Sequence, residues 1–264
     1  MSDKEDELST RNMSILGHLT ELRSRLIFSF ILFIIVFIFS LIKFSYHNID
    51  ISLSQLVYLF LQQPLSDIIN DRGGRMIFTA LHEGFFTQIR VAFYIALFIS
   101  LPFIFIQIWK YVSPGLYKDE KKLFFPFIFA TPFLFCISFL MVYYVVMPIA
   151  WQFFLSFELG ANEMGLPIEV EPRISEYLAL VMRLILAFGV CFQLPVLVLL
   201  LVKVGIVDVD WLAKRRKYCI LFSFILAAII TPPDVISQFL LATPLILLYE
   251  ISILIARIAY RKNN

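Results

Sequence analysis

The sequence predicts an all-α membrane protein that crosses the bilayer six times and keeps both termini in the cytoplasm. Of its 264 residues, 60% are hydrophobic and only 16% are charged, whereas soluble domains are roughly half apolar and a quarter charged. Six long apolar stretches alternate with short polar ones, and most Lys and Arg residues fall in every second polar segment. Because basic residues concentrate on the cytoplasmic side of membrane proteins, this alternation sets the orientation.

The six predicted spans follow from the lengths of the apolar stretches, since about 20 residues cross the ~30 Å hydrocarbon layer. They cover residues 26–42, 91–109, a part of 123–157, 184–202 (or from 175 onward), 218–230, and 235–249 with a continuation past Glu250 to 256. The fifth and sixth spans are short, because about sixteen residues of helix extend only about 24 Å. Such short helices are expected to thin the bilayer locally.

A single transmembrane domain is expected over residues 15–257, flanked by polar cytoplasmic tails at residues 1–14 and 258–264. The first tail is acidic, so the first span is interpreted as an uncleaved helix and not as a signal peptide. Several prolines fall inside the predicted spans, and we expect the bent helices to form a curved wall. The two larger loops, residues 44–81 and 150–174, are predicted to face the outside.

The segment at residues 15–26 is predicted to be an amphipathic helix in the cytoplasmic headgroup region. One face is apolar at helical spacing and is formed by Ile15, Leu19, Leu22 and Leu26. Glu21 and Arg25 share another face. Spacing alone leaves two interpretations of Glu21 open: an i,i+4 pair with Arg25, or a carboxylate available to a ligand.

A second candidate carboxylate lies in the next cytoplasmic loop, at residues 111–122. Pro114 and Gly115 end the preceding helix and permit a turn. Glu120 then lies close to the start of the third span, where the N-terminal helix dipole favours a negative charge. The alternative interpretation is a solvated charged loop or a first-turn cap.

Polar residues also occur at membrane depth, where an ionisable group costs roughly 2.5–3.5 kcal/mol on insertion scales. Gln193 and Glu250 lie deep in their predicted spans. A second group is expected nearer the outer interface and consists of Glu83, Arg90, Gln107, Glu176, Arg183, Asp234 and Gln238. Gln193 and Glu250 each either pack helices of the same chain together or make a functional contact.

The sequence contains no motif for enzyme catalysis. Nucleotide-binding, zinc-protease and serine-hydrolase motifs are absent, and the three His residues show no metal-ligand spacing. The net charge of +2 is divided among short loops, which does not make a nucleic-acid-binding patch. We therefore expect no catalytic residue, no cofactor, no metal and no nucleic-acid partner.

Four motifs occur in order along the chain: HLTELRSRL at 18–26, SPGLYKDEKK at 113–122, FGVCFQLPV at 188–196 and TPPDVISQ at 231–238. With the six-span pattern, they resemble the TatC family of the twin-arginine protein translocase over residues 15–257. The resemblance implies a bacterial inner-membrane receptor that recognises the paired arginines of signal peptides on folded cargo. It also implies proton-motive-force-driven assembly with single-span TatA-like and TatB-like partners, as a homo-oligomer within a hetero-oligomeric complex.

The resemblance also implies site residues. The signal-binding carboxylates of the family fall on Glu21 and Glu120, with supporting positions at Leu19, Arg23 and Tyr111, where relatives often have Phe. Further matching positions are Pro64, Asp234, Gln238 and Glu250. Relatives often have Glu at the position of Gln193. Because an amide keeps the hydrogen bond and loses the titratable proton, Gln193 is expected to dock a partner's spanning helix as a polar group.

Elementary chemistry agrees with this assignment. Carboxylates accept paired N–H bonds from a planar guanidinium fork, and lysine is the poorer ligand because it is a point donor. The predicted topology places Glu21 and Glu120 on the same membrane face, as a shared site requires.

Two other functions are consistent with parts of the sequence. A proton- or ion-coupled secondary transporter would use Glu250, Arg183 and Glu83, and ion-dependent uptake of a small solute by the protein alone would identify it. An assembly scaffold without a ligand of its own would still bind its partners after loss of both Glu21 and Glu120.

Overall fold

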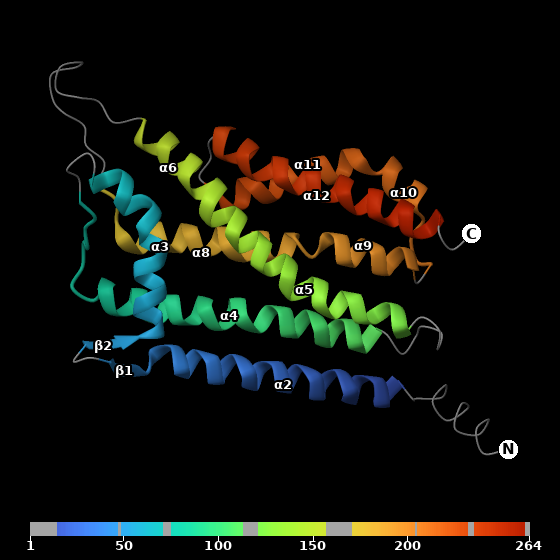
Figure 1. The fold of residues 1–264 in the computed structure, drawn as a ribbon, viewed down its shortest axis with the longest axis horizontal. Coiled ribbons are helices and arrows are strands. Elements are labelled where there is room, and N and C mark those ends of the chain that lie inside the picture. The colour runs from blue at the N-terminus through green and yellow to red at the C-terminus, as the bar shows by residue number, and fades with distance from the viewer. Residues whose placement is uncertain are drawn as a thin grey trace.

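The computed structural model describes residues 15–46, 49–70, 75–112, 121–156, 171–203, 205–231 and 235–261. This part of the chain is almost entirely helical, which confirms the predicted all-α class. Figure 1 shows the long helices lying side by side, with the start of α2 and the end of α12 at the same end of the molecule. We call this end the terminal end, and the opposite end, which carries a β-hairpin, the hairpin end.

The first helix leads into the β-hairpin. Helix α2 (Ile15–Leu41) is followed by strands β1 (Lys43–Tyr46) and β2 (Ile49–Ser52), which pair antiparallel with Lys43 opposite Ser52. Helix α3 (Leu53–Asn70) follows at once and buries Leu61, Leu65 and Ile69, one residue per turn. The predicted outer loop 44–81 therefore contains a hairpin and a helix that hydropathy did not indicate.

The next two spans form a long antiparallel pair. Helix α4 (Glu83–Val112) packs along α2 and returns to the terminal end. Helix α5 (Lys121–Met141), a π-helical segment (Val142–Val146) and α6 (Met147–Leu155) then form one continuous helical run. This run matches the predicted apolar stretch at residues 123–157.

The C-terminal half contains a broken span and a helical hairpin. Helices α8 (Ile174–Cys191) and α9 (Leu194–Lys203) are separated by a turn at Phe192 and Gln193. Pro195 lies in the first turn of α9, where its missing N–H is tolerated. The chain then continues through α10 (Val209–Lys214), α11 (Arg216–Ile230) and α12 (Val235–Arg261).

Five stretches of the described chain are long and apolar enough to span a bilayer: Arg23–Leu41, Glu83–Ile108, Ile128–Leu155, Ile174–Val202 and Gln238–Ile258. Helix α11 is the sixth apolar helix. It has 15 residues, or about 22 Å, and is short as predicted. The prediction of a short sixth helix is wrong, because α12 has 27 residues. The predicted continuation past Glu250 to 256 is confirmed, since Glu250 lies inside α12, where it pairs with Arg216.

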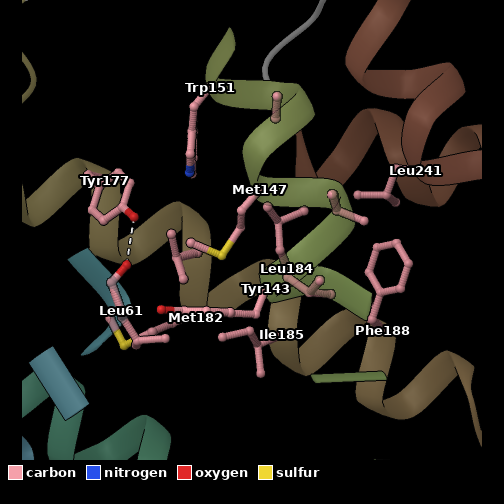
Figure 2. Close-up of a cluster of buried hydrophobic side chains, with 14 of the residues drawn as sticks. Leu61, Tyr143, Met147, Trp151, Tyr177, Met182, Leu184, Ile185, Phe188 and Leu241 are labelled. Carbon is pink, nitrogen blue, oxygen red and sulfur yellow. Dashed lines mark hydrogen bonds between the residues drawn. The ribbon is translucent and has the colours of Figure 1, made fainter. Parts of the chain in front are cut away.

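The core lies where α3, α4, α6 and α8 meet α11 and α12. Met147, Leu178, Phe188 and Leu241 are fully buried there, and Figure 2 shows part of this cluster. Other large apolar side chains face outward instead, including Phe30, Phe133, Leu221 and Ile229. An outward apolar surface of this kind fits a protein that is surrounded by lipid, where helices satisfy their own backbone hydrogen bonds.

Candidate functional site

The predicted signal-peptide site maps to the terminal end. Leu19 and Glu21 fall in the first two turns of α2, and Tyr111 falls in the last turn of α4. Glu120 lies outside the described residues and directly precedes α5 in sequence. Figure 1 shows the start of α2, the end of α4 and the start of α5 close together at the terminal end. The fold thus brings together three helix ends, and each predicted site residue lies at or next to one of them in sequence.

Two arginines in the first turns of α2 are described in full. Arg23 is exposed, and Arg25 Nη1 donates a hydrogen bond of 3.0 Å to Gln107 Oε1 on α4. The expectation that Gln107 lies near the outer interface is wrong. It lies 24 residues after Glu83 on α4, or about 36 Å along the helix, and so belongs to the terminal end with Arg25.

Gln193 lies at the turn between α8 and α9 and is only 3% exposed. Its Nε2 donates a hydrogen bond of 3.2 Å to the Thr131 carbonyl of α5. Its Oε1 is buried and has no hydrogen-bond partner within the described residues. The contact of Nε2 therefore joins helices of the same chain, and the docking of a partner helix by Gln193 stays a prediction.

Glu250 makes a bidentate ion pair with Arg216 at the start of α11. Arg216 Nε lies 2.6 Å from Oε1, and Nη2 lies 2.9 Å from Oε2. Sequence analysis missed this partner because 34 residues separate the two. The pair joins α12 to the first residue of α11, so Glu250 acts here as a contact between helices of one chain.

The Arg216–Glu250 pair predicts a measurable coupling. In a double-mutant cycle with Arg216→Gln and Glu250→Gln, we expect about 1 kcal/mol of coupling free energy, because the pair is bidentate and charge-assisted. Unfolding in mixed detergent micelles measures the four stabilities. The exposed i,i+3 pair Arg173–Glu176, with N and O 2.8 Å apart, is the control and should couple by only about 0.3–0.5 kcal/mol. Additive losses at 216 and 250 would contradict the assigned pair.

The remaining family positions are dispersed. Gln238 lies in the first turn of α12 and is partly buried, and Pro64 lies inside α3. Asp234 lies outside the described residues, as does the turn of residues 232–234 that was expected to join the last two helices.

Glu83 forms a polar junction that sequence analysis did not predict. Its Oε2 accepts hydrogen bonds from the backbone N–H groups of Thr79 (2.7 Å) and Ala80 (3.2 Å), and from Thr79 Oγ1 (3.1 Å). Ser175 Oγ donates to Oε1. The buried carboxylate therefore ties the start of α4 to the start of α8, in keeping with the preference of acidic residues for first helical turns.

The residues of the transporter alternative do not form one site in the described structure. Glu83 is bonded at the start of α4, and Glu250 is bonded to Arg216. Arg183 lines a cavity at the hairpin end and makes no described contact with either carboxylate.

Comparisons with known proteins settle the family. A family model described as Sec-independent protein translocase protein (TatC) matches residues 17–244. This chain belongs to the TatC family. The Magnetococcus marinus TatC is 43% identical over 249 residues, covering 94% of this chain and 86% of that protein. The Rickettsia prowazekii TatC is 44% identical over 238 residues, covering 90% of each.

A solved TatC structure agrees with the fold. The crystal structure of a twin-arginine translocase receptor, TatC, is 33% identical to this chain and superposes with a TM-score of 0.76. The match covers 92% of this chain and 99% of that one. The chain is thus a multi-pass membrane protein of a protein-translocase family, which is a transport family and not a family of catalytic enzymes.

Proposed function

We propose that this chain is the receptor that binds twin-arginine signal peptides of folded proteins and then assembles with TatA-like and TatB-like partners for export. Membership of the TatC family supports the proposal, as does the likeness to a twin-arginine translocase receptor. The observation that carries the proposed site is the meeting of the ends of α2, α4 and α5 at the terminal end.

The mechanism begins with charge. Glu21 and Glu120 hold the two guanidinium groups of the signal through paired, charge-assisted hydrogen bonds. Leu19 and Tyr111 supply apolar contact beside them, and Arg23 supports the same turn of α2. The hydrophobic part of the signal then inserts along the exposed apolar faces of the helices, which include Phe30 and Ile31 of α2. The proton-motive force drives export without nucleotide.

Partner helices are proposed to dock beside α11 and the first turns of α12. Exposed apolar side chains there include Phe222, Ile225 and Phe239, and Gln238 and Asp234 are the polar positions nearby in sequence. Gln193 lies beneath the surface, so its buried Oε1 reaches a partner helix only if α5 and α9 separate. Several copies of the chain assemble within the same complex.

The orientation predicts which sites are accessible from each side of the membrane. The terminal end faces the cytoplasm of a bacterial inner membrane and the hairpin end faces outward. After replacement of Cys136, Cys191 and Cys219 by Ala, a membrane-impermeant maleimide added to spheroplasts should label Ser45→Cys in β1. Arg257→Cys in α12 should react only after lysis, because it faces the cytoplasm. Labelling of Arg257→Cys in intact spheroplasts would reverse the orientation.

Signal-peptide binding tests the proposed site. With full-length protein in nanodiscs, Glu120→Ala should weaken binding of a fluorescent twin-arginine peptide by about tenfold, the cost of one lost charge-assisted contact. Glu120→Gln should weaken it less, because the amide still accepts one hydrogen bond. Fluorescence anisotropy measures both, with Asp119→Asn in the same loop as the control.

Two outcomes of that experiment, and one outcome of a separate partner-binding assay, are informative. Equal losses for Glu120→Ala and Glu120→Gln would mean that charge is the whole effect. The same loss in Asp119→Asn would mean that only the net charge of the loop matters. Partner binding that survives loss of both Glu21 and Glu120, with no peptide binding in the wild type, would favour the scaffold function.

A further inference from the structure

A cavity of about 620 Å³ lies at the hairpin end, bordered by α3, α4, α6, α8 and α11. One part of its wall is apolar and contains Trp151, Phe154 and Leu155 of α6 with Ile229 and Ile230 of α11. The other part carries three guanidinium groups, from Arg90, Arg173 and Arg183. The cavity therefore combines a hydrocarbon surface with strong positive charge.

Two of these charges have no ion-pair partner among the described residues. Arg173 Nη1 lies 2.8 Å from Glu176 Oε1, which neutralises that pair. Arg90 and Arg183 are both exposed and make no hydrogen bond or ion pair with the residues that the structure describes. Among the described residues that line the cavity, Glu176 is the acidic one. The described wall thus offers two guanidinium groups without a counter-ion.

The positions of these two arginines along their helices indicate that the ligand is an anion. Arg90 is seven residues after the start of α4 and Arg183 nine residues after the start of α8, which places them about 10 and 14 Å along their helices. An unpaired charge this far along a spanning helix is unfavourable and calls for an anionic partner. A guanidinium fork binds phosphate oxygens bidentately, and arginine is the preferred residue for such sites.

We propose that this cavity binds the phosphate group of an anionic phospholipid of the outer leaflet, with an acyl chain along α11. The apolar wall continues onto the lipid-facing surface, since Ile229 lines the cavity and is 78% exposed. Helix α11 is only about 22 Å long, and its last residue, Ile230, lines the cavity. Because a short helix thins the bilayer beside it, the lipid headgroups next to α11 reach the depth of Arg90 and Arg183. The site is independent of signal-peptide binding.

Lipid retention tests the proposal. The full-length protein is reconstituted in phosphatidylcholine mixed with phosphatidylglycerol, extracted mildly and examined by native mass spectrometry. The wild type should retain phosphatidylglycerol selectively, and Arg90→Gln with Arg183→Gln should lower its retention by at least about tenfold, the effect of losing one or more charge-assisted contacts. Arg257→Gln, an exposed arginine at the terminal end of α12, is the matched control and should leave retention unchanged.

Further arms separate the alternatives. Arg183→Lys keeps the charge and should retain more lipid than Arg183→Gln. This comparison of single variants can still be made if the double variant fails to fold. Inorganic phosphate should not displace the lipid, and full displacement by it would assign the cavity to a soluble anion. Displacement by a Glu-containing apolar peptide would assign it to a protein partner. Equal retention by the wild type and all arginine variants would overturn the proposal.

Discussion

Replacing Trp151 by alanine is expected to lower the free energy of unfolding by about 3–5 kcal/mol, the usual cost of truncating a buried tryptophan. Trp151 is only 4% exposed. Its ring centroid lies 5.0 Å from that of Tyr177 on α8 and 6.0 Å from that of Phe154. Figure 2 shows it at the outer edge of the core, near the hydrogen bond from the Tyr177 hydroxyl to the Leu61 carbonyl. Truncation therefore removes these ring contacts and enlarges the cavity that Trp151 already borders.

The control for this prediction is a second tryptophan. Trp211 on α10 is 51% exposed, and its main described contact is the Arg215 guanidinium 5.0 Å from the ring centroid. Trp211→Ala should therefore cost only about 0.5–1 kcal/mol, the value of an exposed cation–π contact. Detergent-titrated unfolding followed by circular dichroism compares the two variants. Equal losses would contradict the described core.

Replacing Gly189 by alanine is expected to destabilise the fold by about 1–3 kcal/mol through overpacking. A Cβ atom at this position of α8 would lie 2.7 Å from Cε1 and 3.0 Å from Cδ1 of Phe135 on α5. Phe135 is 1% exposed and is held by the rings of Phe98 and Phe105, at 5.5 and 6.0 Å. Because the ring is buried between these neighbours, the added methyl group requires a shift of the ring or a separation of α5 and α8.

Two further variants check the cause. Gly84→Ala is the control, because a Cβ there would meet its nearest neighbour, Phe78, at 3.7 Å, an ordinary contact. Combining Gly189→Ala with Phe135→Leu should recover part of the loss, since the shorter side chain removes the contacting ring edge. Thermal unfolding in detergent measures all four proteins. A Gly189→Ala protein as stable as Gly84→Ala would mean that α5 and α8 are farther apart than described.

The membrane spans could be predicted because one physical constraint, the thickness of the hydrocarbon layer, sets the length of an apolar stretch. The apolar stretch at 218–230 correctly predicted that α11 is a short helix. The same reasoning underestimated the sixth helix, which was predicted to be short although α12 has 27 residues. Glu250 lies inside α12 and pairs with Arg216, 34 residues away in sequence, and a hydropathy profile cannot show such a pair.

Elements outside the spans were harder to predict. Helix α3 carries Leu61, Leu65 and Ile69 at four-residue spacing, a pattern that could have revealed it within the loop at 44–81. The β-hairpin has no comparable signal, because its strands are four residues each. Gln107 was assigned to the wrong end, although the predicted span 91–109 already ends two residues after it, beside the loop predicted to be cytoplasmic; α4 continues to Val112.

The signal-peptide site depends on a different kind of inference. From spacing alone, Glu21 could also be an i,i+4 partner of Arg25, and Glu120 could be a solvated loop residue or a helix cap. The motifs around the two residues predicted the family, which the comparisons confirm. The structure adds that the ends of α2, α4 and α5 meet. The contacts of Glu83 with Ser175 and of Gln193 with Thr131 could not be predicted from the sequence, because each joins segments more than 60 residues apart.

The most direct test of the receptor function compares two peptides on one protein. A fluorescent signal peptide with an Arg-Arg pair and its Lys-Lys counterpart are titrated onto the full-length protein in nanodiscs. We expect the Arg-Arg peptide to bind at least about tenfold more tightly, because only guanidinium groups form paired bonds with both carboxylates. That preference should vanish when Glu21→Ala and Glu120→Ala are combined. Equal affinity of the wild type for both peptides would mean that the apolar part merely partitions into the bilayer, and would contradict the receptor function.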